Sequence, residues 1–245
     1  SYSPDRFHVV YDIVRGDTAR APCKPIMKPL RGIQLDHSHP LARGLFGCWL
    51  LNEGDGDRIH DIAEGRQGIL YNDISWQPDK AGLSLRFGGN GDYIQFAVHE
   101  PRCNAATGFS WATRLMFWKL PSVAGANAYG PSYQTIGGYA WTLYGQAASD
   151  TLRASIRDAT VNNLTSNSLG SITVGRWFDV AGSFDGAVLS LYVDGAFVQS
   201  LTPGSVLGGT GLALQWGLGG SLGYASPEAN VEHCMFWDRA LTDSE

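Results

Sequence analysis

Carboxylate side chains are the first candidates for chemistry in this sequence, because two of them facing each other can hydrolyse a glycosidic bond. Retaining hydrolysis needs the carboxyl groups about 5–5.5 Å apart, a separation that residues on one face of a strand can supply. Several carboxylates lie instead in turns, where they accept backbone hydrogen bonds: Asp55, Asp57, Asp92, Asp185 and Asp194. The sequence also lacks an H-E-x-x-H motif and a phosphate-binding loop. We therefore predict that the chain is not an enzyme.

Histidine and cysteine residues give no clear metal-site pattern. His37 and His39 form an H-x-H pair that can ligate a metal from one face of a strand, but Pro40 follows them on a connecting segment, which favours solvent or interface positions. The four cysteines are scattered without a C-x-x-C pair: Cys23, Cys48, Cys103 and Cys234. Two of them stand in apolar stretches, so we expect buried free thiols. A disulfide stays an alternative, and its pairing does not follow from the sequence.

Composition restricts the possible functions. The 245 residues include 31 Gly, 10 Phe, 10 Tyr and 8 Trp, and only 17% are charged. Many glycines together with many aromatic residues indicate short strands joined by tight turns. The formal net charge of −5 disfavours a nucleic-acid partner, which needs a basic surface to bind. No apolar run approaches the roughly 20 residues that span a bilayer, so we expect no membrane partner; no secretion signal is recognisable at Ser1.

Strand signals recur after Gly44, with turn residues between them, as in an antiparallel β-sandwich. The clearest is a three-stranded meander over residues 177–201, in which Asp185-Gly186 and Asp194-Gly195 predict type I′ turns. Residues 83–87 and 93–96 flank a glycine-rich loop and predict a hairpin.

The first 43 residues differ from the rest. They contain five prolines, and each proline fixes its own φ and moves the residue before it away from helix. We predict an extended N-terminal arm over residues 1–43, with one strand at residues 7–14, in front of one domain over residues 44–245. Phe7 and Tyr11 are predicted binding residues, since they give the arm an apolar surface that can dock on a neighbouring subunit. A disordered tail is the alternative.

Four segments resemble the laminin-G-like (concanavalin A-like lectin/glucanase) jelly-roll family. G-R-W-F-D-V-A-G-S-F-D-G at residues 175–186, with L-Y-V-D-G at 191–195, is similar to the family's central meander. Residues 47–54, 85–94 and 236–241 resemble its opening strand, a glycine-rich hairpin and its closing motif, in the family's order. The resemblance implies an all-β fold, a two-sheet antiparallel jelly-roll β-sandwich. Family members usually continue past the closing motif, so the natural chain is expected to extend beyond Glu245.

The resemblance also implies candidate site residues. Many family members hold a structural calcium with carboxylates near a sheet edge. Asp61 matches one such position and Glu232 stands where an aspartate is usual, so both are calcium candidates; no other cofactor is expected. Aromatic side chains can stack on sugars or anchor a protein, and we select Tyr133 and Trp141, near a loop-like connection at residues 123–133, as binding-surface residues.

A lead-in at residues 38–45, S-H-P-L-A-R-G-L, resembles that of laminin-G-like proteins encoded among phage virion genes. It implies a non-catalytic virion structural protein, a capsid decoration protein or a head or tail fibre component. Such a protein would bind capsid or other virion proteins through its arm and one sheet face. The alternative is an extracellular carbohydrate-binding module of a secreted or surface protein, with glycans as partners. Homo-oligomerisation stays open.

Overall fold

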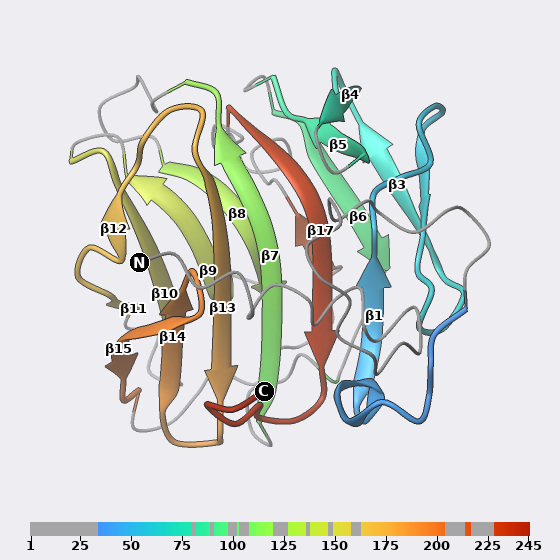
Figure 1. Ribbon diagram of the computed structural model, residues 1–245. Coiled ribbons are helices and arrows are strands. Elements are labelled where there is room, and N and C mark those ends of the chain that lie inside the picture. Colours follow the sequence, from blue (N-terminus) through green and yellow to red (C-terminus); the bar gives the residue numbers. More distant parts are fainter. Residues whose placement is uncertain are drawn as a thin grey trace, which may run out of the picture.

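The computed structural model describes residues 34–79, 82–88, 91–97, 102, 108–119, 127–135, 138–146, 149–157, 163–203, 214–216 and 228–245. These residues form two antiparallel sheets that lie face to face, as Figure 1 shows. One turn of 3-10 helix, η2 (Pro40–Ala42), precedes the first strand. The predicted all-β, antiparallel sandwich is confirmed.

The first sheet, called sheet A, has the strand order β15-β14-β13-β7-β17-β5-β4, and β1 pairs with the last residues of β17, on the same edge whose first residues pair with β5. The chain therefore returns repeatedly to this sheet, and its last strand lies between strands from the first half of the sequence. Its strands are β1 (Leu45–Trp49), β4 (Ser75–Asp79), β5 (Gly82–Arg86), β7 (Phe109–Phe117), β13 (Trp177–Phe184), β14 (Leu189–Val193), β15 (Ala196–Leu201) and β17 (Ala229–Trp237).

The second sheet, called sheet B, has the strand order β11-β10-β9-β8-β16-β6-β3-β2, with β12 paired to β10. It lies behind sheet A in the view of Figure 1. Its strands are β2 (Arg58–His60), β3 (Gln67–Tyr71), β6 (Tyr93–Ala97), β8 (Asn127–Thr135), β9 (Gly138–Gln146), β10 (Thr151–Arg157), β11 (Asn163–Thr165), β12 (Gly170–Ser171) and β16 (Leu214–Trp216).

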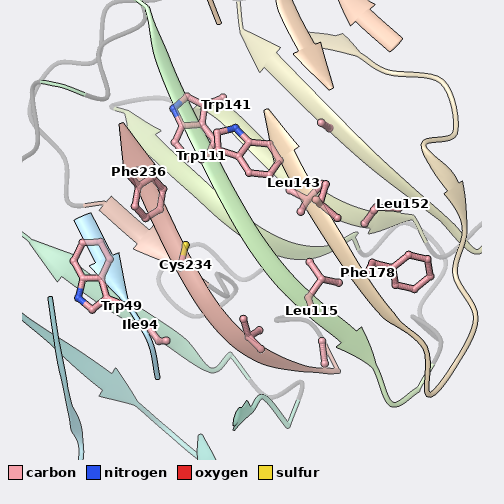
Figure 2. Close-up of a cluster of buried hydrophobic side chains, with 14 of the residues drawn as sticks. Trp49, Ile94, Trp111, Leu115, Trp141, Leu143, Leu152, Phe178, Cys234 and Phe236 are labelled. Carbon is pink, nitrogen blue, oxygen red and sulfur yellow. The ribbon is translucent and has the colours of Figure 1, made fainter. Parts of the chain in front are cut away.

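The hydrophobic core fills the space between the sheets. Its aromatic rings join the two layers: Trp111 of sheet A stacks on Trp141 of sheet B with ring centroids 5.8 Å apart, and Trp49 contacts Phe96 at 4.1 Å. Gly182 makes room for one of these rings, because a Cβ at that position would lie 2.6 Å from the Trp111 indole. Figure 2 shows the cluster, with Trp111 and Trp141 side by side.

The meander predicted over residues 177–201 is present as β13, β14 and β15. Its second turn has the predicted geometry, since Asp194 and Gly195 both adopt positive φ, at 52° and 73°. The first turn is different: Gly186 alone has positive φ, and the Asp185 carboxylate accepts hydrogen bonds from the backbone N–H groups of Ala187 and Val188. The type I′ prediction is therefore right for one turn and wrong for the other.

The hairpin predicted from residues 83–87 and 93–96 is wrong. These segments form β5 and β6, which belong to different sheets, so the glycine-rich stretch between them carries the chain across the sandwich. The buried Asp92 carboxylate stabilises this crossover by accepting hydrogen bonds from the backbone N–H groups of Gly88 and Asp73.

A second apolar cluster lies on the outer face of sheet A, the face directed away from sheet B. Leu35 and Leu41 of the lead-in pack there against Met235 and Trp237 of β17. The Trp237 indole N–H also donates a hydrogen bond to the Leu41 carbonyl at 2.7 Å. The packed unit therefore begins before Gly44, the boundary predicted from sequence.

The earlier part of the predicted arm lies outside the described residues, and so do Phe7, Tyr11 and the strand predicted at residues 7–14. Within the part of the chain that the structure describes, no helix has the length and apolar character needed to cross a membrane.

Candidate functional site

The central strands of sheet A carry charged side chains on their outer face. Arg114 on β7 and Asp179 on β13 are cross-strand partners, so their side chains lie on the same face. Glu232 is the extra residue of β17 at the point where its register with β7 shifts, and it faces the same arginine. We call Arg114, Asp179, Glu232 and the adjacent Trp177 the outer-face cluster.

Arg114 is shared between two carboxylates. Its Nε lies 3.1 Å from a Glu232 carboxylate oxygen and 3.8 Å from an Asp179 carboxylate oxygen. Contact with one nitrogen places these two oxygens no more than about 7 Å apart. The Glu232 side chain is 1% exposed, whereas those of Arg114 and Asp179 are 25% and 24% exposed. The glutamate is therefore buried, and the other two side chains reach the surface.

Asp179 titrates far from the usual range of an aspartate. Burial raises the pKa of its carboxyl group to about 7; Arg114 opposes the shift, and the negative charges of Glu232 and Asp194 add to it. Asp194 lies beside Asp179 because its carboxylate accepts the Asp179 backbone N–H at 3.1 Å, while it also pairs with Arg176. Near neutral pH Asp179 therefore exists in both protonation states.

Indole rings lie next to the arginines of this face. The Arg114 guanidinium carbon is 5.4 Å from the centroid of the partly exposed Trp177 ring. A second pair of the same kind is formed by Arg86, the last residue of β5, which lies 4.1 Å from the ring of Trp118, the residue after β7. Each arrangement fits a cation–π contact and fixes the arginine side chain.

The outer-face cluster combines an aromatic ring with hydrogen-bonding groups of both kinds. A guanidinium donates, a carboxylate accepts, and a carboxyl group that titrates near neutral pH does either. Sugars present apolar ring faces and hydroxyl groups, so this is a set of side chains that suits them. Sequence reasoning did not select Arg114, Asp179 or Trp177. The available signal was a single charge in the middle of each of two apolar strands.

The two calcium candidates do not meet. Asp61 lies beyond β1, where its carboxylate accepts the backbone N–H groups of Cys48 at 2.8 Å and Ala63 at 2.9 Å and pairs with Arg66 at 3.0 Å. Glu232 faces Arg114 on the other side of β17. A guanidinium beside each carboxylate opposes a cation there. Among the described residues, no group of three or more His, Cys, Asp and Glu side chains could hold a metal ion.

The prediction for Trp141 is wrong. Its side chain is 1% exposed and stacks between Trp111 and Phe109, so it belongs to the core and not to a binding surface. Tyr133 pairs with Trp141 across β8 and β9, but its side chain lies outside the described part of the structure.

The thiol prediction holds where it can be examined. Cys48 and Cys234 are buried and do not form a disulfide, on the neighbouring strands β1 and β17. Burial raises the pKa of the Cys48 thiol well above its usual range, so we expect it to stay protonated near neutral pH. Cys23 and Cys103 lie outside the described residues.

Comparison of the fold with solved structures finds proteins of low sequence identity, some of them solved with a sugar. Domain 4 of AbnA, an extracellular GH43 arabinanase from Geobacillus stearothermophilus, was solved with arabinotriose; it matches with a TM-score of 0.64 and 14% identity, covering 82% of this chain and 95% of that domain. The binding domain of Paraclostridial Mosquitocidal Protein 1 matches with a TM-score of 0.64 and 14% identity, over 83% of this chain and 51% of that one.

A Trypanosoma rangeli sialidase in complex with sialic acid also matches, with a TM-score of 0.60 and 15% identity over 82% of this chain. This chain spans about a third of the sialidase, 32% of its length, so the likeness concerns one domain of that enzyme. At these identities the matches show a shared fold. A sequence search of curated proteins finds no match.

The family comparison is more direct. A family model described as the concanavalin A-like lectin/glucanases superfamily matches residues 87–245, which include β7, β13 and β17 and therefore the whole outer-face cluster. The two-sheet fold agrees with it. The chain belongs to the concanavalin A-like lectin/glucanase superfamily.

Proposed function

We propose that the chain is a carbohydrate-binding module that binds sugar on the outer face of sheet A. The main support is the match to an arabinanase domain solved with arabinotriose, of which 95% is covered by this fold. A nearly complete domain of the same architecture accommodates an oligosaccharide in that protein.

The outer-face cluster is the place where the described residues offer the required chemistry. Trp177 supplies a partly exposed ring next to Arg114 and Asp179, whose side chains both reach the surface. Aromatic stacking on an apolar sugar face, with donors and acceptors beside it, fixes both position and orientation. Because acidic groups crowd around Asp179, we expect a neutral sugar to be preferred over an acidic one.

We propose binding without turnover. Two carboxylates within about 7 Å would suit a glycosidase, but Arg114 contacts both of them and Glu232 is buried, so that pair does not flank an open substrate path. A Gly-x-Ser-x-Gly pattern at residues 219–223 lies outside the described residues. That pattern marks a nucleophile on a strand-to-helix turn of an α/β sheet, and the present fold is all-β.

The virion role stays a prediction. It depends on the resemblance of the lead-in at residues 38–45, and none of the similarities described above concerns a virion protein. Glycan binding and capsid attachment are separable by experiment. Glycan binding can be measured with isolated oligosaccharides, whereas capsid attachment requires virion proteins.

A glycan array followed by isothermal titration calorimetry tests the proposal, with arabino-oligosaccharides as the first ligands. We expect specific binding of a neutral oligosaccharide. Trp177→Ala should weaken that binding at least about tenfold, which corresponds to the loss of one stacked ring. Tyr71→Ala is the matched control, because Tyr71 is also a half-buried aromatic residue but lies in sheet B, where it stacks on Tyr93.

Three outcomes would contradict the proposal. Absence of binding to every neutral and acidic glycan tested would reject the carbohydrate role. Binding that Trp177→Ala leaves unchanged and Tyr71→Ala removes would move the site to sheet B. Release of shorter sugars, lost in Asp179→Asn, would show turnover at this cluster.

A further inference from the structure

The two arginine–tryptophan pairs on the outer face of sheet A differ in charge. Arg114, beside Trp177, is held between two carboxylates, which neutralise it. Arg86 lies 4.1 Å from the centroid of the Trp118 ring, and in the part of the chain that the structure describes its guanidinium has no ion pair and no hydrogen bond. The positive charge of the second pair is therefore not matched by the protein itself.

Arg86 is held in place although no anion lies beside it. The Trp118 indole N–H donates a hydrogen bond to the Phe87 carbonyl at 3.0 Å, which fixes the ring on which the guanidinium lies. The carbonyl of Glu228 accepts the Trp118 backbone N–H, but the Glu228 carboxylate pairs with Lys119 at 2.8 Å. A planar guanidinium that is positioned by a ring and has unpaired donors is preorganised for an acceptor from outside the chain.

An unpaired acceptor lies next to this unpaired donor group. Asn230 of β17 is the cross-strand partner of Arg86 and is 9% exposed. Its Nδ2 donates to the Ser84 hydroxyl at 3.4 Å, whereas its Oδ1 is buried and has no hydrogen-bond partner among the described residues. Arg86 does not donate to this oxygen, because its guanidinium lies on Trp118 instead. Buried polar atoms without a partner are rare, so this pair indicates a bound group that the fold does not supply.

Arg86 and Trp177 are the two ends of one row of side chains on the outer face. Cross-strand pairing places Arg86, Asn230, Met116 and Trp177 side by side on the adjacent strands β5, β17, β7 and β13 (Figure 1). Neighbouring strands are about 4.8 Å apart, so the ends of the row are separated by about 14 Å. A single sugar ring is too short for the whole row, but an oligosaccharide can contact both ends.

We propose that Arg86 and Trp118 form a second subsite of the sugar-binding face, which binds the carboxylate of an acidic unit in the same oligosaccharide. This inference rests on the proposed function and names its ligand more closely, as a mixed oligosaccharide that is neutral over Trp177 and acidic at Arg86. A carboxylate matches the guanidinium, which donates two parallel N–H bonds to its oxygens. The preference for a neutral sugar beside Asp179 still holds, because this aspartate lies on β13, at the other end of the row.

Isothermal titration calorimetry of the full chain with paired ligands is the experiment. Each pair consists of an arabino-oligosaccharide and the same oligosaccharide with one terminal glucuronic acid unit. We expect the acidic member to bind at least about tenfold more tightly, through a charge-assisted bidentate contact. This advantage should decrease as NaCl is added, because the charges are partly exposed. It should also require a ligand long enough to span the row.

Substitutions of Arg86 assign the effect to this side chain. Arg86→Gln should remove the advantage of the acidic member and change the affinity for the neutral member less than about twofold. Arg86→Lys should restore only part of the advantage, because an ammonium group lacks the planar fork. Arg153→Gln is the matched control: Arg153 is also a half-buried arginine and the same charge is lost, but it lies on β10 of sheet B. Both affinities should keep their wild-type values in the control.

Two results overturn the second subsite and leave the proposed function intact. One is equal affinity for the two members of each pair, with binding that Trp177→Ala still weakens. The other is an advantage of the acidic member that Arg86→Gln and Arg153→Gln reduce equally, since it would then reflect the net charge of the protein and not a site. Absence of binding by both members overturns the subsite together with the proposed function.

Discussion

The two faces of β7 carry different side chains, and the packing of the fold explains only those on the inner face. Alternate residues point between the sheets, and there Phe109, Trp111, Leu115 and Phe117 are almost fully buried. The opposite face carries Arg114, held between two carboxylates. Burial of apolar surface dictates the inner face. An ion pair on the outer face is weak evidence for stability, so its presence directs the search for function to that face.

The largest expected effect comes from the inner face. Trp111→Ala removes an indole that is 1% exposed and stacks on Trp141 across the sandwich, so we expect the free energy of unfolding to fall by about 3–5 kcal/mol. Urea unfolding monitored by circular dichroism measures it. Trp177→Ala removes the same side chain from the outer face of β13 and should cost less than about 1.5 kcal/mol. Equal losses would remove the distinction between the two faces.

A smaller effect is expected from breaking the ion pair of the outer face. Arg114→Met leaves the buried Glu232 carboxylate without this guanidinium, and we expect a loss of about 2–3 kcal/mol, below the value for a fully buried pair because Arg114 is partly exposed. Adding Glu232→Gln should recover most of it, since the fully buried charge of Glu232 is then removed as well. Additive losses in the double variant would show that the two side chains do not interact.

The sequence was sufficient for the class of fold and for the meander, but not for every strand: the loop-like connection predicted at residues 123–133 is wrong, because most of β8 (Asn127–Thr135) lies there. Alternation of apolar residues and the turn at Asp194-Gly195 predicted the meander with its bounds, because both are local properties. It was not sufficient for the connection between β5 and β6. A glycine-rich stretch between two alternating segments suits a hairpin and a crossover equally well, and only the pairing of each strand elsewhere decides between them.

The outer-face cluster could not be predicted from the sequence for a similar reason. Arg114, Asp179 and Glu232 are far apart in the sequence, and strand register brings them together. Glu232 was selected from a resemblance, as a calcium candidate, whereas the structure gives it a guanidinium partner. For Trp141 the sequence did not reveal which face of its strand points into the core. The packing partners decide this, and those of Trp141 lie in the core.

The smallest effect concerns Asp179, and its sign follows from its pKa. The Asp179 carboxyl group has its ordinary pKa of 3.8 in the unfolded chain and a pKa of about 7 in the folded protein. Between these two pH values the folded state therefore binds more protons than the unfolded state. Stability should therefore fall as pH rises from about 4 to about 7 and stay lower above that. Because the side chain is partly exposed, we expect about 1 kcal/mol between pH 5 and pH 8.

Asp179→Asn provides the test, since asparagine is similar in shape and does not titrate. Urea unfolding of both proteins at pH 5 and pH 8 isolates the contribution of Asp179, because other groups titrate alike in the two. One of these is Glu245, whose pKa is lowered to about 2 by hydrogen bonds from Arg239; it affects stability only in acid. The variant should gain stability relative to wild type at pH 8. If the free energy of unfolding depends on pH equally in both proteins, Asp179 is as well solvated as an ordinary surface carboxylate. The outer face would then lack the partly buried, titrating carboxyl group that most distinguishes it from the inner face.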